Sequence, residues 1–143
     1  MDQFQQNSAG YLANHMARLF AAGLARCIQP LGLAPAQFMV LLELWHDDGR
    51  TQADLTAALD VEQATMANTL KRMERDGLIR REPSEEDRRA RLIHLTDRAR
   101  ALEARAKAAA EMQNAQALAG LEEAERTAFT GLMRRVIANM QRG

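Results

Sequence analysis

Apolar residues recur every three or four positions over most of the chain, which is the spacing of amphipathic helices. The first such stretch predicts a helix over about residues 8–29, which Pro30 and Gly32 end. A second helix is predicted to begin at Pro35, because the first turn of a helix does not use the N–H that proline lacks. It should end before His46.

Capping residues predict where the next two short helices begin. Thr51 and Asp54 have the spacing of a capping box, with aspartate in place of the usual glutamate. Asp60 and Gln63 repeat that spacing, so we expect them to open the following helix. Gly77 is then a natural left-handed residue at the end of that helix.

A hairpin and two long helices complete the predicted order of elements. The segments Leu78–Glu82 and Arg91–Leu95 have the short apolar alternation of strands. Thr96 should cap an alanine-rich helix that runs to about Leu118, and a last helix should span about Leu121–Gln141. The pattern therefore predicts a mainly α fold with a small β-hairpin.

Composition narrows the class of protein. The 143 residues suit one ordinary domain, and an apolar fraction of 47% excludes a disordered chain. The apolar runs are too short to cross a bilayer, and the N-terminus does not resemble a signal peptide. Cys27, the single cysteine, excludes an intrachain disulfide and fits a reducing cytoplasm. We expect a cytoplasmic protein with no membrane partner.

The distribution of charge along the chain is more informative than the net charge about possible anionic partners. The 19 basic and 19 acidic residues cancel, which alone argues against binding to nucleic acid. From residue 71 to residue 100, however, ten basic residues face seven acidic ones. This surplus weakly favours an anionic partner for that segment.

The helix before the hairpin has two distinct faces. Its packing stripe consists of Met66, Leu70 and Met73. A second stripe lies on another side and carries Thr65, Asn68, Thr69 and Arg72, with Arg75 extending it. These side chains can donate hydrogen bonds to base edges, and arginine suits guanine or phosphate. Two short helices followed by a hairpin form the layout of a winged helix-turn-helix, so we expect this helix to read double-stranded DNA.

The predicted hairpin carries a long, charged tip, EPSEEDRRA. Strands of that length could hold Arg88 and Arg89 in a minor groove, where the negative potential is concentrated. Asp87 would accept a hydrogen bond there and orient a neighbouring arginine. The segment RREPSEEDRRARLIHLT is therefore interpreted as a wing rather than a linker.

The run from Gly49 to Thr96 resembles the DNA-binding domain of the MarR family of bacterial transcription regulators, especially its SlyA-like members. EQATMANTLKRMERDGLI resembles the family's recognition helix, and DRRARLIHLT its wing, with the D-x-R motif at Asp87 and Arg89. Asn68 departs from the SlyA-like pattern, which often has arginine there. The likeness extends over nearly the whole chain.

This resemblance implies a homodimer that binds a palindromic operator. The terminal helices, about residues 8–32 and 97–141, would interlock between subunits, and residues about 35–96 would form the winged helix-turn-helix. Most such proteins are repressors that a small aromatic or anionic effector releases from DNA. A ligand pocket is expected between the two parts, where domain junctions concentrate such sites. Candidate lining residues are His15, Arg18, Met39 and Trp45.

Other kinds of site have little support in the sequence. His15, His46 and His94 are scattered and lack metal-ligand spacing, and no catalytic motif is present. Cys27 fits a small buried apolar residue better than a redox sensor. We therefore expect no cofactor, no metal and no enzymatic activity. The alternative to a DNA-binding regulator is a winged-helix module for protein assembly, which the neutral net charge supports.

Overall fold

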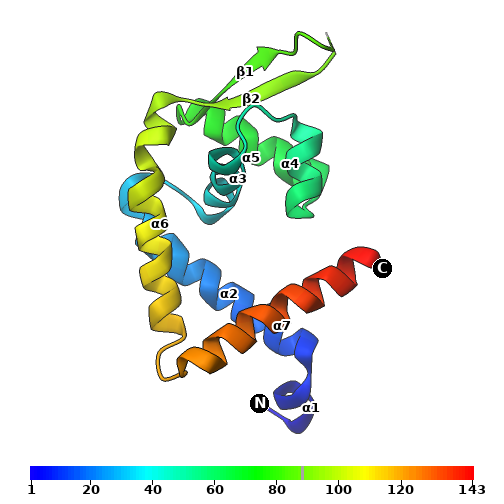
Figure 1. Ribbon diagram of the computed structural model, residues 1–143, viewed down its shortest axis with the longest axis vertical. Helices are drawn as coiled ribbons and strands as arrows, with labels where there is room; N and C mark the ends of the chain where they lie inside the picture. Colours follow the sequence, from blue (N-terminus) through cyan, green and yellow to red (C-terminus); the bar gives the residue numbers. More distant parts are fainter. Residues whose placement is uncertain (88) are drawn as a thin grey trace.

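The computed structural model describes residues 1–87 and 89–143, and it is mainly helical with one two-stranded sheet (Figure 1). Its elements are, in order, α1 (Gln3–Asn7), α2 (Ala9–Ile28), the 3₁₀ turn η1 (Gln29–Leu31), α3 (Pro35–His46), α4 (Gln52–Leu59), α5 (Gln63–Arg75), β1 (Ile79–Pro83), β2 (Arg91–Leu95), α6 (Asp97–Ala117) and α7 (Glu123–Arg142). The prediction of helices around one hairpin is confirmed.

Side-chain caps set several helix starts where the sequence predicted them. Thr51 Oγ1 accepts from the backbone N–H of Asp54 at 3.1 Å, and the Asp54 carboxylate accepts from the N–H of Thr51 at 3.2 Å. This reciprocal pair satisfies two N–H groups that the first turn of α4 leaves without helical partners. Thr96 caps α6 with a single hydrogen bond, in which its Oγ1 accepts from Ala99 N at 3.2 Å.

One predicted cap is wrong. Asp60 does not open α5; it ends α4 in the left-handed conformation with φ of 52°. The residue before α5 is Glu62, which makes no side-chain cap hydrogen bond. Aspartate suits both an N-cap and a left-handed position, so its spacing to Gln63 was ambiguous.

Smaller differences concern element boundaries. The first strand begins at Ile79, one residue later than predicted, and the last helix begins at Glu123 instead of Leu121. The short helix α1 was not predicted. A capping box between Asp2 and Gln5 starts it, and no residue of α1 is buried.

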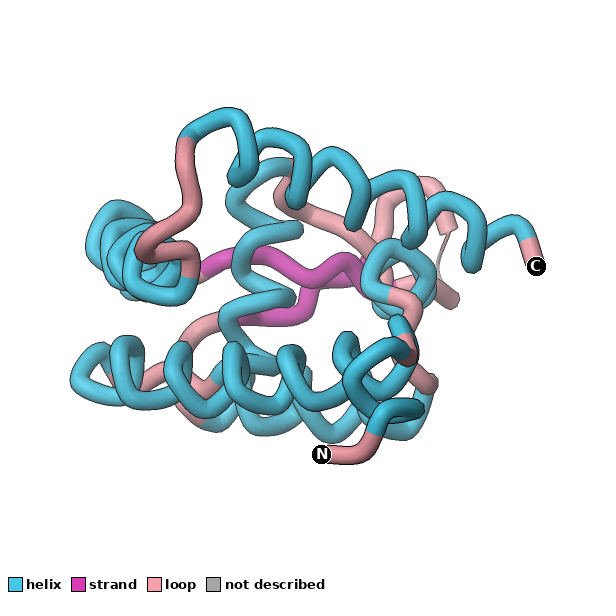
Figure 2. The backbone as a smooth tube through the Cα atoms, turned by 90° about the horizontal axis from the view of Figure 1, so that it is seen from below, coloured by secondary structure: helices cyan, strands magenta, loops and turns pink. Residues whose placement is uncertain are grey.

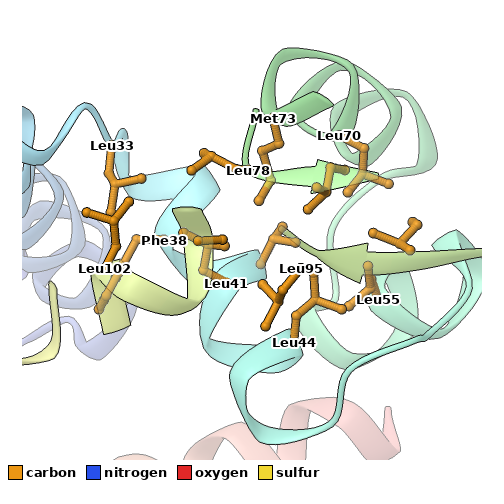
Figure 3. Packing of buried hydrophobic residues seen from close by; sticks show 14 of the residues in the cluster. Leu33, Phe38, Leu41, Leu44, Leu55, Leu70, Met73, Leu78, Leu95 and Leu102 are labelled. Atoms are coloured by element: carbon orange, nitrogen blue, oxygen red, sulfur yellow. The ribbon is translucent and has the colours of Figure 1, made fainter. Parts of the chain in front are cut away.

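The hydrophobic core lies in the winged part, where α3, α4, α5 and α6 meet the inner face of the hairpin (Figure 3). The largest fully buried side chains lie on α3, α4, α5 and β2, at the end of α2 and just before β1. They are Ile28, Val40, Leu41, Leu44, Leu55, Met66, Leu70, Met73, Leu78 and Ile93. The strands pair antiparallel, with Ile79 opposite Leu95 and Arg81 opposite Ile93.

The terminal helices extend away from this core. α2 packs against α6, and a Cβ at Gly23 would lie 2.5 Å from the end of the Gln113 side chain. α7 leaves the end of α6 and runs along the edge opposite α2 (Figure 2). In the described part of the chain, no single helix is long and apolar enough to span a membrane. One pair, Ala9–Leu31 with Pro35–His46, bent by 74°, passes that test on length and composition only.

Candidate nucleic-acid interface

The two faces predicted for α5 are present in the structure. Met66, Leu70 and Met73 are each at most 1% exposed and hold the helix against the core. Thr65, Asn68 and Arg72 are exposed on another side. In the part of the chain that the structure describes, the side chain of Arg72 forms neither a hydrogen bond nor an ion pair. Its guanidinium is therefore available to an anionic partner.

Two members of the polar stripe already have partners within the protein. Thr69 is half-buried, and its hydroxyl donates to the backbone oxygen of Thr65 at 2.9 Å. Its oxygen can still accept a hydrogen bond, but its proton is engaged. Arg75 is paired with Asp76, with Nε and Oδ1 3.1 Å apart. Among the described residues, the members of the stripe whose side-chain donors have no partner within the protein are therefore Thr65, Asn68 and Arg72.

The end of α5 is tied to α3 by residues that the sequence did not single out. Gln37, a buried polar residue, donates from Nε2 to Asp76 Oδ2 at 3.0 Å. Its Oε1 accepts from the backbone N–H of Ala34 at 3.1 Å, so the amide is satisfied on both sides. The hydrogen bond from Arg75, followed by that from Gln37, lowers the pKa of the Asp76 carboxyl. These contacts fix where the polar stripe points.

Among the described residues of the hairpin tip, the side chains of Ser84 and Asp87 accept hydrogen bonds from the backbone. Ser84 Oγ accepts from the backbone N–H groups of Glu86 and Asp87, each at 3.3 Å. Ser84 N donates to Ala90 O at 3.0 Å and closes the loop. Asp87 Oδ1 accepts from the backbone N–H of Arg89 at 2.9 Å. Asp87 thus accepts from the backbone of Arg89, the neighbouring arginine.

Arg89 is exposed at this tip, on the same hairpin that follows α5 in the chain. Arg88, the other predicted wing arginine, lies outside the described residues. Ser84 was also missed as a structural residue of the tip. An ST-type turn could have suggested it, because serine next to proline commonly bonds backbone N–H groups nearby.

Asp48 anchors the base of the wing to the body of the domain. Its Oδ1 accepts from the backbone N–H of Leu95 at 2.9 Å, and its Oδ2 lies 3.2 Å from Arg100 Nη2. Arg50 adds an antiparallel bridge to Ile93. These contacts join the base of the hairpin to the segment after α3 and to α6.

A cavity of about 360 Å³ lies between α2, α3 and α6, at the junction of the winged part and the terminal helices. Its walls are mainly apolar, with Phe20, Leu24, Phe38 and Leu42. The polar residues that line it are Lys107, Glu111, Gln113 and Asn114. The Gln113 Oε1 atom is buried and has no hydrogen-bond partner among the described residues. The cavity can accept a flat apolar molecule that carries a polar substituent.

None of the four residues predicted for a ligand pocket lines this cavity. Trp45 comes nearest, with its ring 6.0 Å from that of Phe38 and its indole N–H donating to Ala99 O at 3.1 Å. His15 packs on Tyr11, while Arg18 and Met39 are exposed. The lining residues could not be identified from the sequence because they depend on how α2 crosses α6.

The remaining candidates lie apart from these sites. Cys27 is half-buried, packs against the core and borders a second cavity of about 270 Å³ with Arg26 and Gln116. Among the described residues, no three His, Cys, Asp or Glu side chains are grouped so that they could hold a metal ion.

Comparison with known proteins identifies the family. Residues 31–90 match the model of the MarR family. The transcriptional regulator PA3341 is 36% identical in sequence, with a TM-score of 0.80 over 95% of this chain and 100% of the other. The transcriptional repressor CouR, bound to a 23-mer DNA duplex, is 28% identical, with a TM-score of 0.86 over 94% of this chain and 96% of the other.

A third solved structure concerns BpsR of Bordetella bronchiseptica, whose DNA binding is regulated by 6-hydroxynicotinic acid. It is 28% identical to this chain, with a TM-score of 0.85 over 95% of this chain and 96% of that one.

The family match, the similarity to PA3341 over full length and the two-faced helix beside an anchored wing all indicate the same family. This chain belongs to the MarR family of transcription regulators and has its winged helix-turn-helix fold.

Proposed function

We propose that this MarR-family regulator works as a homodimer that binds a palindromic operator in double-stranded DNA and represses transcription until a small effector releases it. The observation that carries the proposal is α5, which is held by three fully buried residues and leaves Thr65, Asn68 and Arg72 exposed beside the wing. The protein would bind DNA in the cytoplasm.

The roles of α5 and the wing follow from the kind of groups they expose. In helix-turn-helix proteins the second helix lies in the major groove, and its side chains contact base edges. Thr65, Asn68 and Arg72 would read bases there, with Thr69 as an acceptor and Arg75 near the backbone. Arg89, and Arg88 with it, would contact phosphates and the minor groove. The relative CouR was solved on a DNA duplex, which supports DNA binding by this fold.

A homodimer would cover the apolar residues that the terminal helices expose. α7 has no buried residue among those described, although it exposes Leu132, Val136, Ile137 and Met140 by 53–76%. Phe4 and Leu19 are similarly exposed on α1 and α2. A solvated monomer gains nothing from such a surface, and an obligate dimer typically buries more than about 2,000 Å². The partner most consistent with the family is a second copy of this chain.

The effector site is proposed in the cavity between α2, α3 and α6. This position supports regulation because the cavity touches both the winged part, through Phe38 and Leu42, and the terminal helices, through Leu24 and Gln113. A ligand that fits one relative arrangement of the two parts better than another shifts the population toward it. The effector would be a small aromatic or anionic compound, a class to which the ligand of BpsR belongs.

Selection of duplexes from a random DNA library tests the function as a whole. We expect the selected site to be an inverted repeat with half-sites about one helical turn apart, bound by a dimer in light scattering. A panel of aromatic acids should then weaken that binding or raise the melting temperature. Failure to enrich any sequence above scrambled DNA would instead favour a protein-assembly module.

A further inference from the structure

The tip of the C-terminal helix makes a direct contact with the turn that precedes α5. Gln141, near the end of α7, donates from Nε2 to Asp60 Oδ2 at 2.8 Å, across 81 positions of the chain. Figure 1 shows the C-terminal end of α7 on the side of the molecule that carries α4. Among the described residues, this is the one side-chain hydrogen bond or ion pair that joins α7 to the winged part.

Asp60 occupies a position from which movement passes to α5. It ends α4 with φ of 52°, the single non-glycine residue with positive φ in the described chain. Its backbone N–H bonds back to Ala57 and Thr56. Two residues then separate it from Gln63, the first residue of α5. A turn this short transmits a displacement of Asp60 to the N-terminal end of α5, which is the end that meets base edges in this fold.

The position of α7 would depend on the partner subunit that covers its apolar face in the proposed dimer. The helix has no buried residue, and a short link with Gly120 at φ of 88° joins it to α6. In a dimer the partner subunit would fix α7, and the contact at Asp60 would then hold the turn before α5 relative to the dimer axis.

We propose that the Gln141–Asp60 hydrogen bond is a strut that sets the distance between the two copies of α5, so that both residues determine which operator spacing the dimer accepts. This inference rests on the proposed homodimer and its operator. Gln141 and Asp60 are positioning residues in this account: they touch no DNA and act through the placement of α5. Half-site spacing follows from the geometry of the dimer, whereas base preference within each half-site follows from the side chains of α5.

Two variants remove the strut without disturbing the fold at either end. Asp60→Gly deletes the carboxylate and keeps the turn, because glycine adopts positive φ without steric cost. Gln141→Ala deletes the donor on an exposed helix. Asp60→Asn is the matched control, since asparagine also tolerates the left-handed conformation and keeps a side-chain oxygen that accepts the bond.

The measurement is fluorescence anisotropy on three duplexes: the selected operator and two versions with one base pair inserted or deleted between the half-sites. Wild-type protein and Asp60→Asn should prefer the selected spacing. In Asp60→Gly and Gln141→Ala that preference should fall about fivefold or more, the low end of typical coupling between sites. All variants should remain dimers in light scattering and keep their preference among bases within a half-site.

Each other result decides against the strut. The proposal is overturned if either deletion variant keeps the wild-type spacing preference, or if Asp60→Asn loses it too. Wild-type binding that ignores spacing would overturn it as well, while the proposed function stands. If wild-type protein binds none of the duplexes above scrambled DNA, the failure is that of the proposed function itself.

Discussion

The winged part of this chain differs from the helices at its two ends, α1 and α7, in how many of its apolar residues are buried. In the winged part, residues such as Leu44, Leu55 and Leu70 are fully buried, and polar contacts such as Gln37–Asp76 brace the elements. Among the described residues, α7 has 20 residues and none of them is buried, and the short helix α1 also has no buried residue. The difference fits the proposed homodimer, in which a partner would cover the apolar residues that α1 and α7 leave exposed to water.

This contrast separates two kinds of substitution that look alike in sequence. Leu44 and Leu132 are both leucines on amphipathic helices, yet the first is fully buried and the second is 53% exposed. Changes in the winged part should therefore alter stability at every protein concentration. Changes on α7 should act through association, so their effect should depend on concentration.

The largest expected effect comes from placing a charge on the apolar face of α7. Val136→Glu would bury an unpaired carboxylate in each of two symmetric positions, at a cost of roughly 3 kcal/mol or more per copy. The dimer should weaken at least a hundredfold, and light scattering at micromolar concentration should find monomers. Ala138→Glu, on the opposite side of the same helix, is the control and should leave the dimer intact. A dimer that survives Val136→Glu would place the interface elsewhere.

A smaller effect is expected for a cavity in the winged core. Leu44→Ala should lower the free energy of unfolding by about 2–5 kcal/mol, because the removed side chain is fully buried among packed neighbours. Urea denaturation at several protein concentrations measures it, and the loss should be the same at each one. Met39→Ala, on the exposed side of the same helix, should change stability by no more than about 0.5 kcal/mol in the dissociated protein. A concentration-dependent loss for Leu44→Ala would contradict the division into two parts.

The smallest effect concerns the contact that orients α5. The pKa of Asp76 is lowered from its ordinary value of 3.8, mainly by hydrogen bonds from Arg75 and Gln37. Because the folded pKa is the lower one, the ionised carboxylate contributes its stability above 3.8, and this is lost as the pH falls through the lowered value. Asp76→Asn should therefore flatten the acid end of the plot of melting temperature against pH.

Much of the fold was predictable because its signals are local. The caps at Thr51 and Thr96 and the two faces of α5 depend on residues within one or two turns, so spacing alone revealed them. Asp60 was misassigned for the same reason, since a local pattern permitted two roles and the three-dimensional turn selected one. The wing segment was recognised from its charges and its flanking strands.

The contacts that position the site could not be predicted, because they join segments distant in the chain. Asp48 bonds to Leu95, and Gln37 to Asp76, across 47 and 39 positions. No periodicity links such pairs. The cavity was expected at the right junction but with other residues, since its lining depends on the close crossing of α2 and α6 at Gly23.

The central claim is that α5 reads bases while the wing contacts the DNA backbone, and a salt titration of two arginine variants tests it most directly. Operator and scrambled duplexes would each be titrated with Arg72→Ala and Arg89→Ala. Arg105→Ala, which removes one positive charge from the exposed side of α6, is the control. The logarithm of affinity against the logarithm of salt concentration counts the phosphate contacts.

Arg72→Ala should lose about 1–3 kcal/mol on the operator and much less on scrambled DNA, because a base contact is missing. Arg89→Ala should weaken both duplexes alike and reduce the salt slope by about one unit per lost phosphate contact. Equal losses for Arg72→Ala on both duplexes would mean that α5 touches only the backbone. Unchanged affinity for Arg89→Ala on both would mean that the wing does not contact DNA, and either result would contradict the account.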